Sequence, residues 1–170
     1  MSLTIADQYY LKALDEYPYD LEFALENINY ALSYEREHSG ANCMMGLVYM
    51  EQFQQYDIAE DYFVESMAND PLNLKTCHAY IKLLIETSQC DKAFKLIAYA
   101  QKLKGADKAT FLQYTATIYE RKKNLLLAKA KLNEALHYAY TSEQMETLEG
   151  EIKRLEKKAD CIKKINYKLV

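Results

Sequence analysis

The chain of 170 residues has little glycine and proline, with four and two residues respectively, and it has no tryptophan. Strands joined by tight turns need more of both residues, so this shortage excludes a β-rich fold and favours an all-helical one. Half of the residues are apolar, which is enough to build a core and excludes a disordered chain.

The usual sequence signals of export and membrane insertion are also missing. The first seven residues contain neither the basic nor the apolar segment of a cleavable signal peptide. No stretch approaches the ~20 apolar residues that a membrane-spanning helix needs. We therefore expect a cytoplasmic protein with no membrane partner.

Signals of catalysis and metal binding are equally scarce. The cysteines form no CxxC pair, so we expect no zinc site and interpret them as small buried hydrophobes; they are Cys43, Cys77, Cys90 and Cys161. The three histidines, at positions 38, 78 and 137, lie far apart, and no glycine-rich phosphate loop is present. The sequence therefore predicts a protein that is not an enzyme and holds no cofactor or metal.

One pattern is present throughout: alanine recurs with a nearly constant period, in steps of 35, 34 and 35 residues, at Ala24, Ala59, Ala93 and Ala128. Four residues after each alanine comes a large apolar residue: Ile28, Phe63, Ile97 and Leu132. Three residues further on comes a small one: Ala31, Ser66, Ala100 and Ala135. A period of this length indicates stacked helical repeats.

Local breaks divide the pattern into helix pairs. A first helix is expected from about Ile5 to Tyr17, where Pro18 ends it, and Asp20 is expected to cap the second helix. Further breaks or turns are expected at Ser39-Gly40, Asp70-Pro71, 88–91, Gly105 and 122–124. Connections this short require consecutive helices to pack antiparallel.

The second repeat shows a family pattern, with Met45-Gly46, then Tyr49, Ala59, Phe63 and Pro71. This pattern resembles the tetratricopeptide repeat, in which an apolar residue and glycine are followed by tyrosine, alanine, phenylalanine and proline. The resemblance covers about residues 5–140. It implies a right-handed α-solenoid of antiparallel helix pairs.

Four such repeats are expected, at about 5–38, 39–71, 72–105 and 106–140. Small residues at Gly46, Ala116 and the repeated alanines would let the helix backbones approach closely. In the first repeat, Leu11 replaces the small residue and Leu14 replaces the tyrosine; Asn42 stands where the family has tryptophan in the second.

Residues 141–170 depart from the repeat. They carry one apolar stripe at helical spacing: Met145, Leu148, Ile152, Leu155, Ala159 and Ile162. We interpret this segment as a C-terminal capping helix that covers the last apolar face of the stack. A coiled-coil dimerisation helix is the alternative.

The resemblance also implies where a partner would bind, because leading helices of this family line a concave groove that holds a peptide or helix. Projecting that face onto the chain gives the candidate partner-binding residues Gln8, Lys12, Cys43, Leu47, Met50, Lys75, His78, Lys82, Gln113, Thr117 and Arg121. The predicted function is a non-enzymatic protein–protein interaction scaffold whose protein or peptide partner the sequence does not name.

Charge is divided unevenly along the chain, and this leaves two alternatives open. Residues 1–74 carry a net charge of −12, and residues 75–170 carry +8. One alternative is a self-assembling scaffold, a monomer or weak homodimer that associates through these halves or through the last helix. The other is a nucleic-acid-associated adaptor, but acidic residues interrupt the basic runs and the pI is about 5.5, so we expect no nucleic-acid partner.

Overall fold

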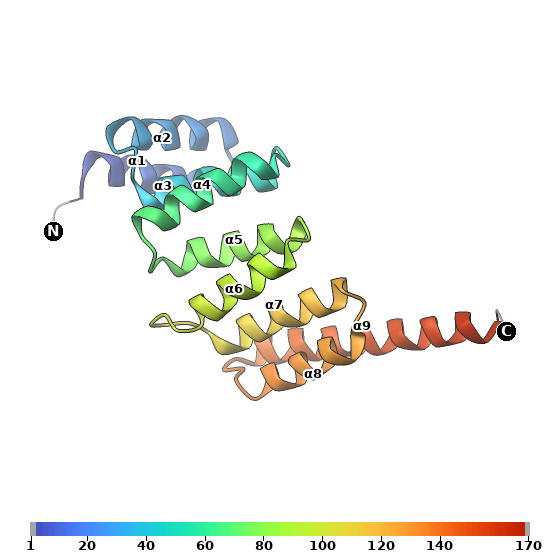
Figure 1. Cartoon of the computed structure of the whole chain (residues 1–170). Helices are drawn as coiled ribbons and strands as arrows, with labels where there is room; N and C mark the ends of the chain where they lie inside the picture. The colour runs from blue at the N-terminus through green and yellow to red at the C-terminus, as the bar shows by residue number, and fades with distance from the viewer. Residues whose placement is uncertain (1–2, 169–170) are drawn as a thin grey trace. The chain divides into compact units, whose positions relative to one another are not determined.

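The computed structural model describes residues 3–168, and within that range it contains helices and no strand (Figure 1). The helices are α1 (Ile5–Glu16), α2 (Leu21–Tyr34), α3 (Ser39–Glu51), α4 (Tyr56–Asn69), α5 (Leu74–Glu86), α6 (Cys90–Ala100), α7 (Lys108–Arg121), α8 (Leu125–Leu136) and α9 (Ser142–Lys168). They belong to two compact units: unit 1 ends at Thr87 and contains α1–α5, and unit 2 begins at Ser88 and contains α6–α9.

Most helices begin where a polar side chain caps the first turn. The Asp20 carboxylate accepts a hydrogen bond from the Phe23 backbone N–H, as predicted, and Thr4 and Asp7 form a capping box on α1. Asparagine or aspartate also caps α5, α7 and α8, at Asn73, Asp107 and Asn124.

Three predicted breaks are displaced. Ser39 and Gly40 lie inside the first turn of α3, which His38 caps. The turn after α5 is expected to extend over 88–91, but Cys90 is already the first residue of α6. Helix α6 ends at Ala100, before Gly105, which lies in the following loop with a φ of 85°.

The turns before α4, α6 and α8 share an unusual backbone conformation. Gln54, Ser88 and Lys123 have φ values of 54°, 59° and 60°, in the left-handed region. Each residue lies two positions before the helix that follows it. The repeat is therefore visible in the backbone as well as in the side chains.

The core of unit 1 depends on close approach between helices. Ala24, Ile28, Ala59 and Phe63 are all fully buried. At Gly46, a Cβ atom would lie only 2.7 Å from Cε1 of Phe63, so α3 and α4 touch where glycine has no side chain. This contact confirms the predicted role of Gly46 as a small residue between two helices.

The predicted register of α1 is wrong. Leu11, which the pattern placed at the small-residue position, is 42 % exposed, and Leu14 is 38 % exposed. Ala13 is instead fully buried and packs with Ala24 and Ala31 of α2. The small residue that lets α1 approach α2 is therefore Ala13, two positions further along the helix.

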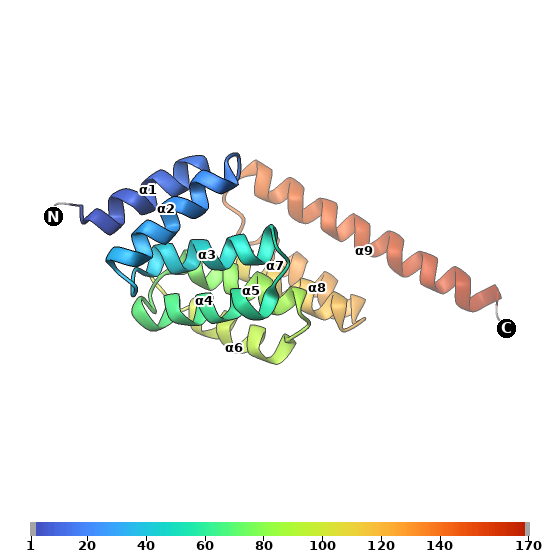
Figure 2. The ribbon, with the colours of Figure 1, turned by 90° about the horizontal axis from the view of Figure 1, so that it is seen from above.

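In unit 2, α7, α8 and α9 enclose a separate cluster. Leu148 and Leu155 of α9 are buried against Ala116, Ala128 and Leu132 of α7 and α8. Helix α9 starts 34 residues after α7, and α7 starts 34 residues after α5. The last helix therefore keeps the register of a leading helix, which the sequence pattern missed, and it runs on beyond α7 and α8 in both views (Figures 1 and 2).

The cysteines are only partly as expected. Cys43 and Cys77 are buried and Cys90 is half-buried, but Cys161 is exposed on α9, so the prediction of a buried residue is wrong there. All four thiols are free. None of the described helices has the length and apolar character needed to cross a membrane.

Candidate protein-binding face

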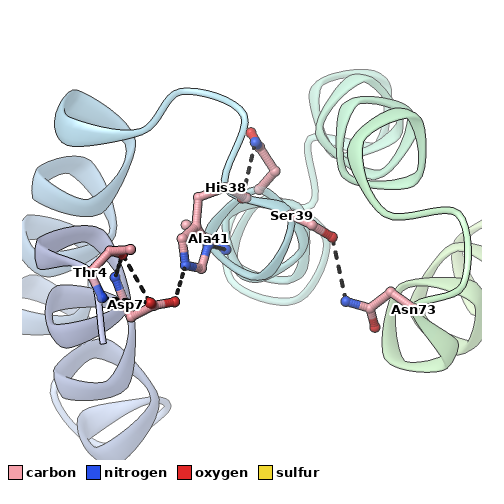
Figure 3. Close-up of polar contacts among 7 residues, drawn as sticks. Thr4, Asp7, His38, Ser39, Ala41 and Asn73 are labelled. Atoms are coloured by element: carbon pink, nitrogen blue, oxygen red, sulfur yellow. Dashed lines mark hydrogen bonds and ion pairs between the residues drawn. The ribbon is translucent and has the colours of Figure 1, made fainter. Parts of the chain in front are cut away.

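A chain of polar contacts links the N-terminal ends of α1, α3 and α5 in unit 1 (Figure 3). It starts at Thr4, whose backbone N–H and hydroxyl both donate to the Asp7 carboxylate, at 2.8 and 2.9 Å. The second Asp7 oxygen lies 3.2 Å from Nε2 of His38, at the start of α3. These contacts lower the pKa of Asp7, with the Thr4 backbone N–H as the main cause.

His38 is held from both sides of its ring. Its Nδ1 accepts a hydrogen bond from the Ala41 N–H at 3.0 Å, so this nitrogen carries no proton. In the neutral ring the proton is then on Nε2, which donates to Asp7. His38 thus caps α3 and anchors it to α1, and it is 9 % exposed.

A second set of contacts continues from α3 to α5. The Asn73 side-chain amide, which caps α5, donates to the Ser39 hydroxyl at 3.4 Å. Ser66 donates to the Ser39 carbonyl at 2.8 Å, so the Thr76 hydroxyl, 2.8 Å away, donates to Ser66. Buried hydroxyls that are all paired in this way fix the relative position of the helices.

A hollow of about 520 Å³ lies beside these contacts. Its lining includes the carboxylates of Asp7, Glu35 and Asp70 and a single cation, Lys75. Both ring nitrogens of His38 are engaged, and neither is bonded to the Ser39 hydroxyl, so the Asp7–His38 contact does not activate a nucleophile. Among residues 3–168 no group of His, Cys, Asp or Glu is arranged to hold a metal ion.

The seam between α3 and α5 contains the apolar candidates. Cys43 is 6 % exposed and packs with Phe63 and Leu83, so it belongs to the core and offers no surface to a partner, contrary to the projection. Leu47 and Met50, one and two turns further along α3, pack on the same cluster but stay partly exposed.

The basic candidates lie along the neighbouring stripe of α5. Lys75 and Lys82 are exposed and His78 is half-buried, at positions i, i+3 and i+7 of one helix face. Burial raises the pKa of the Cys43 thiol, and a hydrogen bond with Thr76 and then the positive charge of Lys75 partly offset this effect.

The α1 candidates, by contrast, do not join this seam. Lys12 has its Nζ 4.9 Å from the ring centre of Tyr9, and Tyr9 packs on Tyr30 and Tyr34 of α2. Lys12 therefore belongs to an aromatic surface of α1 and α2. Gln8 is exposed on α1.

In unit 2 the predicted face of α7 is already engaged by α9. The Gln113 amide donates to Glu151 at 2.6 Å, and the Thr117 hydroxyl donates to the Gln113 carbonyl at 3.0 Å. The side-chain amide of Gln113 is thus already used within unit 2. Arg121, the last candidate, is exposed at the end of α7.

An ion-pair network strengthens the contact between α7 and α9. The two terminal nitrogens of Arg154, Nη1 and Nη2, donate to the Glu120 carboxylate at 2.7 and 2.6 Å, and Lys158 Nζ donates to it at 2.8 Å. Chiefly because of the Arg154 hydrogen bonds, the pKa of Glu120 falls to about 2.

Comparison with solved structures identifies this arrangement of helices. A structure reported for the functional characterization of PilF from Pseudomonas aeruginosa matches 91 % of this chain and 69 % of its own, with a TM-score of 0.77 and 16 % identity. TTC0263, a thermophilic TPR protein of Thermus thermophilus, matches 86 % of this chain and 80 % of its own, with a TM-score of 0.71 and 16 % identity.

The chain has the tetratricopeptide-repeat fold. No protein-family model matches the sequence. No curated protein matches it significantly either. The likeness therefore establishes the fold and leaves the partner to be derived from the chain's own surface.

Several residues that build this tetratricopeptide-repeat unit escaped the sequence pattern. Asn42, at the position of the family's tryptophan, is buried and donates to the Arg36 and His38 carbonyls. It fastens the loop before α3 instead of filling space. The sequence did contain a signal for this role, because hydrogen-bonding residues cluster at positions 38, 39 and 42, where a helix must be capped.

Proposed function

We propose that the protein is a non-enzymatic interaction module that binds a peptide or helix of another protein on the α3–α5 face of unit 1. This face is defined by Leu47 and Met50 on α3 and by Lys75, His78 and Lys82 on α5. The tetratricopeptide-repeat fold supports an interaction scaffold in general terms. The choice of this face rests on its own chemistry.

The observation that carries the proposal is the position of two lysines. Residues 1–87 contain 15 acidic and only four basic residues. Two of those four, Lys75 and Lys82, are exposed on a single face of α5. A cationic stripe in an acidic unit selects partners by charge, because most of the surrounding surface repels carboxylates.

The neighbouring apolar residues supply the remainder of the recognition. Leu47 and Met50 are partly exposed above a packed cluster, and methionine adapts its shape to different apolar groups. A fitting partner segment therefore presents one or two apolar side chains to α3 and carboxylates to α5. Affinity would come from a few such central contacts.

The nucleic-acid alternative has less support from the structure. Several cations in the basic C-terminal half are already in ion pairs: Arg154 and Lys158 share the Glu120 carboxylate, and Lys129 contacts Glu156. Cations that are committed to ion pairs contribute little to phosphate binding.

The test is binding of a peptide selected against the full chain from a library, measured by calorimetry. For the variant Lys75→Ala/Lys82→Ala we expect at least a tenfold loss of affinity and a weaker dependence on salt. The matched control Lys102→Ala/Lys104→Ala removes the same charge from exposed loop positions in unit 2 and should change affinity by less than twofold. Equal losses in both variants would show that only net charge matters and would reject this face.

A further inference from the structure

One end of unit 1 carries an aromatic surface that the proposed function does not use. We define this aromatic face by Ile5 and Tyr9 on α1 and by Phe23, Tyr30 and Tyr34 on α2. The α2 residues lie at i, i+7 and i+11, on one stripe of that helix. The Tyr9 ring joins the two helices, with ring centres 5.1 Å from Tyr30 and 5.8 Å from Tyr34.

This aromatic face is open to solvent. Tyr34 is 59 % exposed, and Ile5, Phe23 and Tyr30 are exposed to a similar degree. Grouped apolar exposure of this kind marks an interaction surface more often than scattered single residues do.

The chemistry around the aromatic face is acidic. Residues 5–34 contain six carboxylates and one lysine, a net charge of −5. Asp20, Glu22 and Glu26 are exposed on α2 or at its start. The one lysine shows which group suits these rings, because its ammonium lies 4.9 Å from the centre of Tyr9.

The far end of α9 has the complementary properties. Its apolar stripe is buried at Leu148 and Leu155 but uncovered at Ile162, which is 45 % exposed. Helix α9 has 27 residues and α8 has 12, so α8 cannot cover the whole stripe. Residues 153–168 carry seven basic and two acidic residues, a net charge of +5. Two of these cations, Arg154 and Lys158, already contact Glu120, whereas Lys153, Lys157 and Lys164 are exposed.

We infer that the aromatic face of one copy binds the basic far end of α9 from a second copy, so that the protein self-associates head to tail. Ile162 would contact the rings, and the lysines would lie over the tyrosine faces and beside the carboxylates. Every chain carries both surfaces, the aromatic face and the basic far end of α9. The contact is therefore heterologous and can be extended by further copies.

Two matched charge reversals test this inference. The first, Lys157→Glu/Lys164→Glu, reverses the α9 end; the second, Glu22→Lys/Glu26→Lys, reverses the rim of the aromatic face. All four residues are exposed. Sedimentation velocity of the full chain, from 1 to 200 µM at low salt, follows the mass above the 19.8 kDa monomer.

We expect the wild type to gain mass with concentration and each reversed variant to weaken association at least tenfold. Mixing the two variants should restore association, because the unchanged basic helix end of the second variant then meets the unchanged face of the first, and the new acidic helix end meets the new basic face. The control Lys102→Glu/Lys104→Glu should associate like the wild type, and circular dichroism should show equal helix content in every variant.

Three results would overturn the inference. A constant monomer mass for the wild type would show that the two surfaces do not join separate copies. Association that survives either reversal would place the contact elsewhere. Loss of association without rescue on mixing would show that the α9 end and the aromatic face are not each other's partners.

Discussion

Gly46 provides the sharpest test of how the helices pack, since replacing it with alanine sets two opposing effects against each other. In a helix interior, alanine is favoured over glycine by about 1 kcal/mol. At Gly46, however, the added Cβ would lie 2.7 Å and 2.8 Å from two carbons of the Phe63 ring. Ordinary carbon–carbon contacts need about 3.5–4 Å, so the ring or the helix must move.

The ring has little room to move. Phe63 is fully buried, and its ring stacks on Tyr80 with centres 6.0 Å apart. Inserting a methyl group into a packed core costs about 1–3 kcal/mol. Contacts as short as 2.7 Å at a fully buried ring place the cost in the upper part of this range, about 2–3 kcal/mol. After subtracting the gain in helix propensity of about 1 kcal/mol, we expect Gly46→Ala to lower the free energy of unfolding by about 1–2 kcal/mol.

Gly150 is the matched control. It lies inside α9, and a Cβ there would meet nothing within 4 Å. The same substitution, Gly150→Ala, should therefore raise the free energy of unfolding by up to about 1 kcal/mol. Urea unfolding of the full chain, followed by circular dichroism, measures both changes.

A double variant identifies the cause. In a Phe63→Leu background the ring is gone, so Gly46→Ala should cost at least about 1 kcal/mol less than it does in the wild type. A Gly46→Ala variant at least as stable as the wild type, or a cost that stays the same without the ring, would refute a clash with Phe63.

Two further predictions concern electrostatics and backbone conformation. Glu120→Gln should destabilise the chain by about 1–2 kcal/mol at pH 7, because the folded pKa of about 2 lies below the ordinary value of 4.5. Solvent screening of the half-exposed Arg154 and Lys158 keeps this loss below the value that the pKa shift alone would give. A carboxylate with a lowered pKa stabilises the fold above pH 4.5 and loses that effect as the pH falls to 2, so urea midpoints of wild type and variant should converge over that range; a gap that stays constant would contradict the assignment. Lys123→Gly should raise the free energy of unfolding by about 0.5–1 kcal/mol, because the φ of 60° costs little for glycine, whereas Lys123→Ala should gain nothing in the same assay.

The repeat itself could be predicted from sequence, because its cause is local. Ala24, Ala59, Ala93 and Ala128 are fully buried, as their period indicates. A small residue is required wherever two helix backbones approach closely, and this requirement recurs at every pair. The helical pairs and the all-α fold follow directly from it.

The ends of the chain were less predictable. In α1, both Leu11 and Leu14 are exposed, whereas the smaller Ala13 is buried. The sequence did not predict this, because hydrophobicity alone does not show which residue faces the neighbouring helix. In α9, the charged sequence hides a leading-helix register that only the start at Ser142 reveals. A terminal helix packs against neighbours on one side only, so fewer of its positions are apolar and its pattern is harder to recognise.

The candidate face was predicted in part. The stripe of Lys75, His78 and Lys82 on α5 is set by helical spacing, and a single helix suffices to predict it. The depth of Cys43 and the engagement of Gln113 by Glu151 depend on neighbouring helices far away in the sequence. Spacing along one helix carries no information about such contacts.

Methionine-methyl NMR of the peptide complex tests the central claim most directly. Met50 is partly exposed on the α3–α5 face, whereas Met67 lies on α4 and Met145 on α9. On titration with a bound partner peptide, the Met50 methyl resonance should shift while those of Met67 and Met145 stay in place. Shifts of Met67 or Met145 with an unmoved Met50 would place the partner on another surface and contradict the account.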